Sequence, residues 1–133
     1  MDMKTIKKAE EIISANRLSC IMSLIDFDGY PTGSTITVSK NKGIEWLTFC
    51  TGIGSNKSRR IEICKHASIC FSSEEPLYNI TLIGDIEILT DNLIKKEMWY
   101  DGLKNHFSGP NDPNYCVLKF TTKRHNLMIG GEG

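Results

Sequence analysis

The chain has 133 residues, of which 40% are hydrophobic and 24% charged, and its 16 basic and 16 acidic residues leave no formal net charge. This composition is that of a folded globular domain and argues against a disordered chain or a protein devoted to nucleic acid. No apolar run approaches the roughly 20 residues that cross a bilayer, and residues 1–8 lack the apolar region of a signal peptide. A cytoplasmic protein without membrane partners is expected.

The five cysteines are interpreted as reduced thiols. They are odd in number and form no Cys-x-x-Cys spacing, so neither a disulfide framework nor a metal site is expected. Three or four of them are expected in the core, because a free cysteine behaves as a small hydrophobic residue. They are Cys20, Cys50, Cys64, Cys70 and Cys116.

The first half of the chain predicts a helix followed by three strands. Within residues 4–15, Ile6, Ala9, Ile12 and Ile13 recur at helical spacing. Runs rich in apolar and β-branched residues then alternate with Gly, Pro and Asn turn signals, which indicates an antiparallel meander. The predicted strands are residues 18–25, 34–39 and 44–51, with turns at 26–31 and 41–43.

The second half predicts two more helices and further strands. Ser55 opens a helix that runs to about Lys65, and Asp91 caps another that runs to about His106. Gly84 interrupts a long strand, where a bulge or bend is expected. The predicted strands are 68–73, 79–89 and 115–122, residues 125–129 are compatible with one more, and the tail at about 130–133 is expected to be disordered.

Together these elements predict one domain over residues 1–133. Six or seven strands joined mostly by hairpins, with two or three helices between them, indicate an antiparallel β-barrel in a mainly β or α+β fold. A kink in the long strand suits a small closed barrel, whose strands must coil to pair with their neighbours.

The helix that begins at Ser55 has an unusual charge distribution. Lys57, Arg59 and Arg60 lie in its first turn and a half, where the helix dipole is already positive, and the first acid, Glu62, comes late. An anion bound at the helix N-terminus would offset this repulsion, so the sequence predicts a phosphate site. The alternative, a solvated helix start with an ordinary cap, stays open. Arg59 and Arg60 cannot both face one pocket.

Other motifs carry less weight. A P-loop needs Gly directly before the Lys, whereas Asn56 precedes Lys57, and the surrounding meander is not a βαβ unit. His66, His106 and His125 have no mutual metal-ligand spacing and are expected at the surface or at helix ends. No Gly-x-Ser-x-Gly nucleophile motif is present.

Several short segments, in a fixed order over roughly residues 18–122, resemble the pyridoxamine 5′-phosphate oxidase-like family of FMN-binding split barrels. The matching segments are Gly29-Tyr-Pro31, Phe49-Cys50-Thr51, Ser55-Asn56-Lys57, the kinked strand 79–89 with Asp91 after it, Trp99, and residues 109–113. Each segment is short, and their order and spacing carry the resemblance.

The resemblance implies an FMN cofactor and a homodimer with two sites at the subunit interface. Ser55 and Lys57 would hold the FMN phosphate, which agrees with the charge argument above. Cys50, Thr51 and Asn56 would line the same loop.

The flavin ring would lie over the strand that follows Pro31. The residues beneath it, which would act mostly through backbone groups, are Ser34, Thr35, Ile36 and Thr37. Asn79 lies where the family often has an amide that reaches the flavin. Trp99 or Phe107 from the other subunit would complete the pocket.

Two departures from the family's oxidase members bear on function. Ser34 and Ser39 stand where those members carry Arg and Lys, although Lys40 is adjacent. The segment 126–131 lacks the Arg and His residues that bind pyridoxamine phosphate. Oxidation of vitamin B6 is therefore not expected, and the chain resembles the short, general-stress-protein-like branch.

The leading hypothesis is an FMN-dependent oxidoreductase with an unknown small-molecule substrate. The flavin would perform the electron chemistry, which fits a sequence without a persuasive set of catalytic side chains. The alternatives are a non-enzymatic flavin carrier or redox sensor, a split barrel that binds haem or a deazaflavin, and a structural dimer without a ligand.

Overall fold

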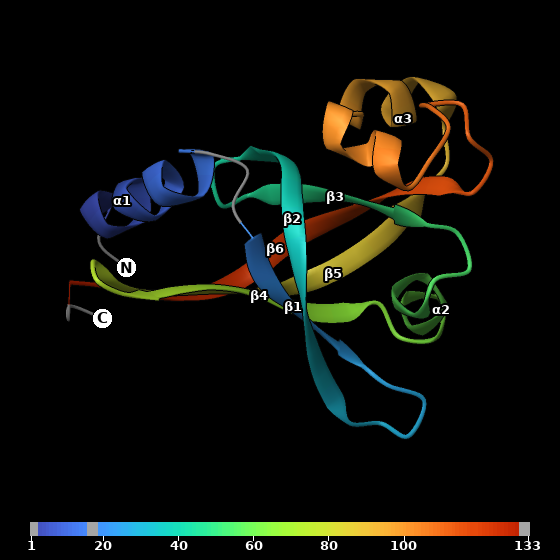
Figure 1. The fold of residues 1–133 in the computed structure, drawn as a ribbon. Helices are drawn as coiled ribbons and strands as arrows, with labels where there is room; N and C mark the ends of the chain where they lie inside the picture. The colour runs from blue at the N-terminus through green and yellow to red at the C-terminus, as the bar shows by residue number, and fades with distance from the viewer. Residues whose placement is uncertain (1–2, 16–18, 131–133) are drawn as a thin grey trace.

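The computed structural model describes residues 3–15 and 19–130. Residues 131–133 of the tail predicted at about 130–133, and the first residue of the predicted strand 18–25, lie outside the described residues, whereas Gly130 is described and its N–H donates to the carbonyl of Leu77. Figure 1 shows the arrangement of the elements. In chain order they are α1 (Met3–Ser14), β1 (Ser19–Ile25), β2 (Pro31–Lys42), β3 (Trp46–Gly52), α2 (Asn56–Ile63), β4 (His66–Glu74), β5 (Leu77–Leu89), α3 (Asn92–Met98), the 3₁₀ helix η1 (Asp101–Asn105) and β6 (Tyr115–Ile129).

The six strands form a closed barrel in the order β1-β2-β3-β6-β5-β4, and every neighbouring pair is antiparallel. This confirms the predicted fold class. β2 pairs with β3 only from Val38 onward, whereas its first half pairs with β1 alone. The hairpin of β1 and β2 therefore projects from the barrel toward the end that carries α2 (Figure 1).

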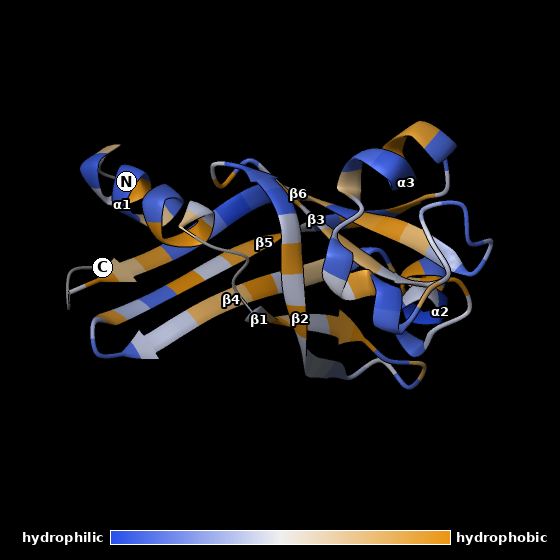
Figure 2. Ribbon diagram, turned by 45° about the horizontal axis from the view of Figure 1, so that its top comes forward, coloured by the Kyte–Doolittle hydropathy of each residue, from blue (hydrophilic) through white to orange (hydrophobic). Residues whose placement is uncertain are grey.

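The barrel interior is filled by alternate residues of the strands. Figure 2 shows hydrophobic and polar residues alternating along β4, β5 and β6, as expected when one face of each strand is buried. Phe49, Leu82 and Phe120 are fully buried in this core. Ala9 and Ile13 bring the apolar face of α1 into the same cluster, so the amphipathic helix predicted at 4–15 is confirmed.

The predicted irregularity at Gly84 is confirmed. The register between β5 and β6 shifts between Ile83 and Gly84. A Cβ atom at Gly84 would collide with the backbone carbonyl of Thr121 and lie 3.1 Å from the ring of Phe120. The two strands can approach this closely because residue 84 has no side chain.

The helix predicted from Asp91 to about His106 is wrong beyond Met98. Asp91 does cap α3, but Trp99 has extended backbone angles (φ −63°, ψ 141°) and the chain re-enters a helix only as η1. Gly102 has low helix propensity. The Trp99 ring turns toward Tyr115, with a centroid distance of 5.4 Å. Tertiary packing therefore overrides the local helical pattern.

Four strands are longer than predicted, β4 and β5 by a few residues and β2 and β6 by more. β6 is one strand of 15 residues that includes the exposed charged residues Lys123 and Arg124. Arg124 pairs with Ile83 of β5, and Lys123 is the extra residue at the register shift. β2 extends beyond 34–39 at both ends.

The cysteines are less buried than predicted. Cys20 and Cys116 are buried, whereas Cys50, Cys64 and Cys70 are half-buried, and all five carry free thiols. Cys64 caps the end of α2 and Cys70 lies on the outer side of β4, so neither position faces the core fully. None of the helices within residues 3–15 and 19–130 is long and apolar enough to span a bilayer.

Candidate functional site

The candidate site begins where β3 turns into α2. Gly54 has φ of +78°, a conformation that glycine adopts without strain, and Ser55 follows as the helix N-cap. The Ser55 Oγ accepts from the backbone N–H of Ser58 at 3.2 Å. The Ser58 Oγ donates to the carbonyl of Gly52 at 2.9 Å. This network fixes the helix start and confirms the predicted cap.

The first turn of α2 offers donors for an anion. Among the described residues, the backbone N–H groups of Asn56 and Lys57 have no acceptor, as expected at a helix N-terminus. The Lys57 side chain is half-buried, and no ion pair joins it to the described carboxylates. Burial, and secondly the charge of Arg60, lower the pKa of Lys57. A bound anion would relieve both effects.

The two arginines of α2 both contact the hairpin of β1 and β2. The Arg60 guanidinium donates to the hydroxyl of Thr32 on β2 and to the carbonyl of Asn56. Arg59 lies over the exposed ring of Phe27, 5.6 Å from its centroid, in the loop between β1 and β2. Of the three cations at this helix start, Lys57 is therefore the one that has no partner among the described side chains.

Cys50 and Thr51, the two predicted site residues at the end of β3, differ in their contacts, and only Thr51 contacts the start of α2. The Thr51 Oγ1 donates to Ser55 Oγ at 3.5 Å. The Cys50 thiol contacts the hydroxyl of Tyr115 and the carbonyl of Met98, both at 3.5 Å, in the cluster under α3. The backbone of Cys50 pairs with Val117 of β6, and its sulfur faces the second core, so its side chain does not join the loop.

The predicted flavin-facing segment of β2 pairs residue by residue with β1. Ser34 and Thr37 are half-buried, and Ile36 packs against the main core. Thr35 is exposed and lines a hollow of about 260 Å³. Since Thr35 lies three residues beyond Thr32, about 10 Å along the strand, β2 connects the start of α2 with this outer face.

Asn79 lies on the outer face farther around the barrel. Its Oδ1 accepts from the hydroxyl of Thr81 at 3.1 Å. Adjacent positions lead from Thr35 through Ile21 and Cys70 to Thr81, which is three strand spacings, or about 14 Å. Within one protomer the ten predicted residues therefore fall into a helix-start group and an outer-face group, linked by β2.

The sequence argument missed two residues that shape this site. Thr32 holds Arg60 from 28 residues away, and Phe27 covers Arg59; neither has a local sequence signal. Ser58 could have been found from its spacing to the Ser55 cap. Ser39, which stands where oxidase members carry a Lys, is buried with its hydroxyl 2.7 Å from that of Thr48.

Trp99 and Phe107, expected to serve the other subunit's pocket, pack within their own chain. Each ring lies 5.4 Å from the Tyr115 ring, centroid to centroid, and each is half-buried.

Comparison with known proteins assigns the family. The family model described as Pyridoxamine 5′-phosphate oxidase like matches residues 4–127. The chain belongs to this family, as the short segments between Gly29 and Pro113 had indicated. No curated protein matches the chain.

Solved structures agree on the fold. The chain is similar to a protein from Clostridium acetobutylicum related to general stress protein 26, with 23% identity, a TM-score of 0.87, and 98% of this chain and 92% of that chain covered. General Stress Protein 26 from Bacillus anthracis has 19% identity and a TM-score of 0.78, with 94% and 92% covered. A pyridoxamine 5′-phosphate oxidase-related, FMN binding protein from Nostoc punctiforme has 15% identity and a TM-score of 0.71, with 96% and 82% covered.

Proposed function

We propose that this protein binds FMN and acts as an FMN-dependent oxidoreductase on a small molecule in the cytoplasm. The observation that carries the proposal is the start of α2, where the half-buried Lys57 and two backbone N–H groups without an acceptor among the described residues lie in one helical turn. The family and the FMN-binding neighbour from Nostoc punctiforme support the same ligand.

The residues fit the phosphate of FMN. Lys57 has its charged form disfavoured by burial, and a phosphate dianion would restore it. The Ser55 and Thr51 hydroxyls lie beside the free N–H groups, and such donors at a helix N-terminus are typical of phosphate sites. Asn56 would add its N–H, and Cys50 its backbone.

The flavin ring would lie along β2, over Ser34, Thr35, Ile36 and Thr37. When bound, FMN supplies the electron chemistry, and the chain supplies orientation and hydrogen bonds. Because Asn79 is about three strand spacings from Thr35, it would meet a flavin only at the far side of the outer face. We propose that two copies form a homodimer across this face, with one FMN site from each.

The absorbance spectrum of the purified protein, with the released chromophore identified by mass, tests the proposal. FMN bands are expected. Haem or deazaflavin bands would show that the protein binds one of those ligands and not FMN. A colourless protein that takes up no added FMN would refute the proposal. Reduced flavin that a small molecule reoxidises faster than oxygen alone would distinguish an enzyme from a carrier or sensor.

Replacing Lys57 tests the site itself. We expect Lys57→Ala to weaken FMN binding by about 1.5–3 kcal/mol, the scale of a charged hydrogen bond. Fluorescence titration of the apo-protein measures the affinity. Arg59→Ala is the matched control, because Arg59 lies over Phe27 and should change the affinity little. Equal affinities for both variants would remove Lys57 from the site.

A further inference from the structure

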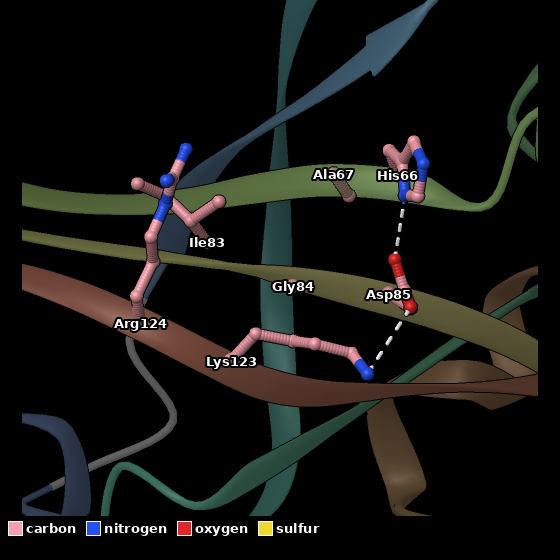
Figure 3. Close-up of a pocket in the computed structure, with 7 residues that line it drawn as sticks. All are labelled: His66, Ala67, Ile83, Gly84, Asp85, Lys123 and Arg124. Carbon is pink, nitrogen blue, oxygen red and sulfur yellow. Dashed lines mark hydrogen bonds and ion pairs between the residues drawn. The ribbon is translucent and has the colours of Figure 1, made fainter.

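A second hollow lies on the barrel wall, apart from the proposed flavin site. It has a volume of about 600 Å³ and includes none of the ten residues assigned to FMN. Figure 3 shows it between β4, β5 and β6. Its lining residues are His66, Ala67, Ile83, Gly84, Asp85, Lys123 and Arg124.

One end of the hollow holds a connected polar network. The His66 Nδ1 lies 2.7 Å from Asp85 Oδ1, and the Lys123 Nζ lies 3.7 Å from Asp85 Oδ2. The hydrogen bond from His66 is the main cause that lowers the pKa of Asp85. Since an ionised carboxylate can only accept, the Nδ1 of His66 donates in this hydrogen bond, and Lys123 adds an ion pair at the other carboxylate oxygen.

The other end holds a guanidinium without a protein partner. Among the described residues, no hydrogen bond, ion pair or ring contact engages the Arg124 side chain. In Figure 3 it rises beside Ile83, apart from the network around Asp85. A guanidinium presents a planar set of donors that matches a carboxylate or phosphate in two places at once.

The surroundings add positive charge. A smaller hollow of about 300 Å³ shares Asp85 and Lys123 with the first and adds Lys65, Lys119 and Glu87. The two hollows together hold four Lys or Arg residues and two carboxylates, whereas the whole chain has equal numbers of both signs. The local field therefore favours anions.

We propose that this hollow binds a small organic anion, with its carboxylate or phosphate group on Arg124 and an apolar body over Ala67 and Gly84. Lys123 and the imidazole ring of His66 bound the opposite end. An ordinary solvated basic surface would also be charged, but it would have neither the concave floor nor a histidine held by a half-buried carboxylate.

NMR titration of the ¹⁵N-labelled protein tests this site. The probes are phenyl phosphate and benzoate, with benzyl alcohol as the neutral control. We expect saturable shifts confined to amides of residues 66–67, 83–85 and 123–124, and none of these shifts with benzyl alcohol. Tighter binding of phenyl phosphate assigns a phosphate monoester as the ligand class, and tighter binding of benzoate assigns a carboxylate.

Variants separate a built site from diffuse attraction. Arg124→Gln should weaken binding of the better probe about tenfold or more, and Arg124→Lys, which keeps the charge and loses the planar donors, should weaken it severalfold. Lys96→Gln, on exposed α3 surface, should change it less than twofold. Shifts that do not saturate, or equal binding by Arg124→Lys and the unmodified protein, would overturn the proposal. The spectrum of each variant without probe verifies its fold.

Discussion

Tyr115 shows how one side chain fixes several segments of the chain. It is fully buried, its hydroxyl donates to the carbonyl of Lys95 at 2.7 Å, and its ring contacts Trp99 and Phe107. The Lys95 ammonium lies 5.4 Å from the centre of the same ring and donates to the carbonyl of Asp112 at 2.9 Å. α3, η1 and β6 are therefore held together through one phenol.

We expect Tyr115→Phe to lower the free energy of unfolding by about 1–3 kcal/mol, because the buried carbonyl of Lys95 loses its donor. Urea unfolding measures the loss. Tyr30→Phe is the control, since Tyr30 is 69% exposed and should cost almost nothing. An unchanged midpoint for Tyr115→Phe would mean that another donor replaces the hydroxyl.

At the scale of single residues, predictability from sequence depends on the range of the interaction. The Ser55 cap and the charge of Lys57 were predictable because a helix start is a local structure. The bond from Arg60 to Thr32 was not, because it depends on how the β1–β2 hairpin projects toward α2. The assignment of Asn79 to the site still rests on the family resemblance.

At the scale of elements, β5 and β6 owe their close approach to Gly84. We expect Gly84→Ala to destabilise the fold by about 1–3 kcal/mol, because the new methyl group meets the Thr121 carbonyl. Gly109→Ala is a matched control, since nothing lies within 4 Å of a Cβ at that position. Thermal unfolding of both variants gives the comparison, and equal melting temperatures would contradict the packing described for β5.

The loop before β6 depends on the ionised carboxylate of Asp112. Its oxygens accept from the backbone N–H groups of Asn114 and Ser108, both at 2.9 Å, and these bonds lower the pKa of Asp112 below its ordinary 3.8. A lowered pKa in the folded state means that the stabilisation is complete above pH 3.8. It is lost as the pH falls through the lower, folded-state value.

We therefore expect the unmodified protein to be more stable than Asp112→Asn at pH 7, with a difference that shrinks as the pH falls below about 4. Urea unfolding at several pH values between 7 and 2.5 measures it. Asp101→Asn is the control, because Asp101 is exposed and pairs only with Lys104 at the surface. If the difference in the free energy of unfolding did not change with pH, the charge of Asp112 would not contribute to stability.

Two errors in the predicted elements, the end of the helix after Met98 and the length of β6, have the same kind of cause. The helical pattern continued past Met98, but packing of Trp99 on Tyr115 ended the helix there. The strand pattern weakened at Lys123 and Arg124, but the strand continued, because Arg124 pairs with Ile83 of β5 and Lys123 is only the extra residue at the register shift. In both places long-range contacts decided the backbone, and a local pattern contains no information about them.

At the scale of the whole molecule, the barrel was predictable because alternation, turn residues and the Gly84 irregularity all indicated antiparallel pairing. The strand order was not predictable in the same way, because the pairing of β3 with β6 joins distant parts of the chain. The two groups of candidate site residues likewise became visible only when the strands were placed around the barrel.

The proposed homodimer gives a prediction at this scale. Light scattering with FMN present should yield twice the chain mass of 15.0 kDa. Ile21→Lys, a charged substitution at an exposed apolar position of the outer face, should shift the mass toward the monomer. Because Ile63 is also exposed and apolar but lies on α2, Ile63→Lys is the control. A monomer in the unmodified protein would contradict the dimer.

The position of β6 also has a consequence for biosynthesis. This strand lies between β3 and β5, so before its translation the first five strands can form only an open sheet with β3 and β5 as edges. Both edges expose unpaired backbone groups, which are prone to pair with other chains. The barrel can therefore close only when β6 inserts between these two edges, and the open sheet before that step is the stage at which the chain is most prone to pair with other chains.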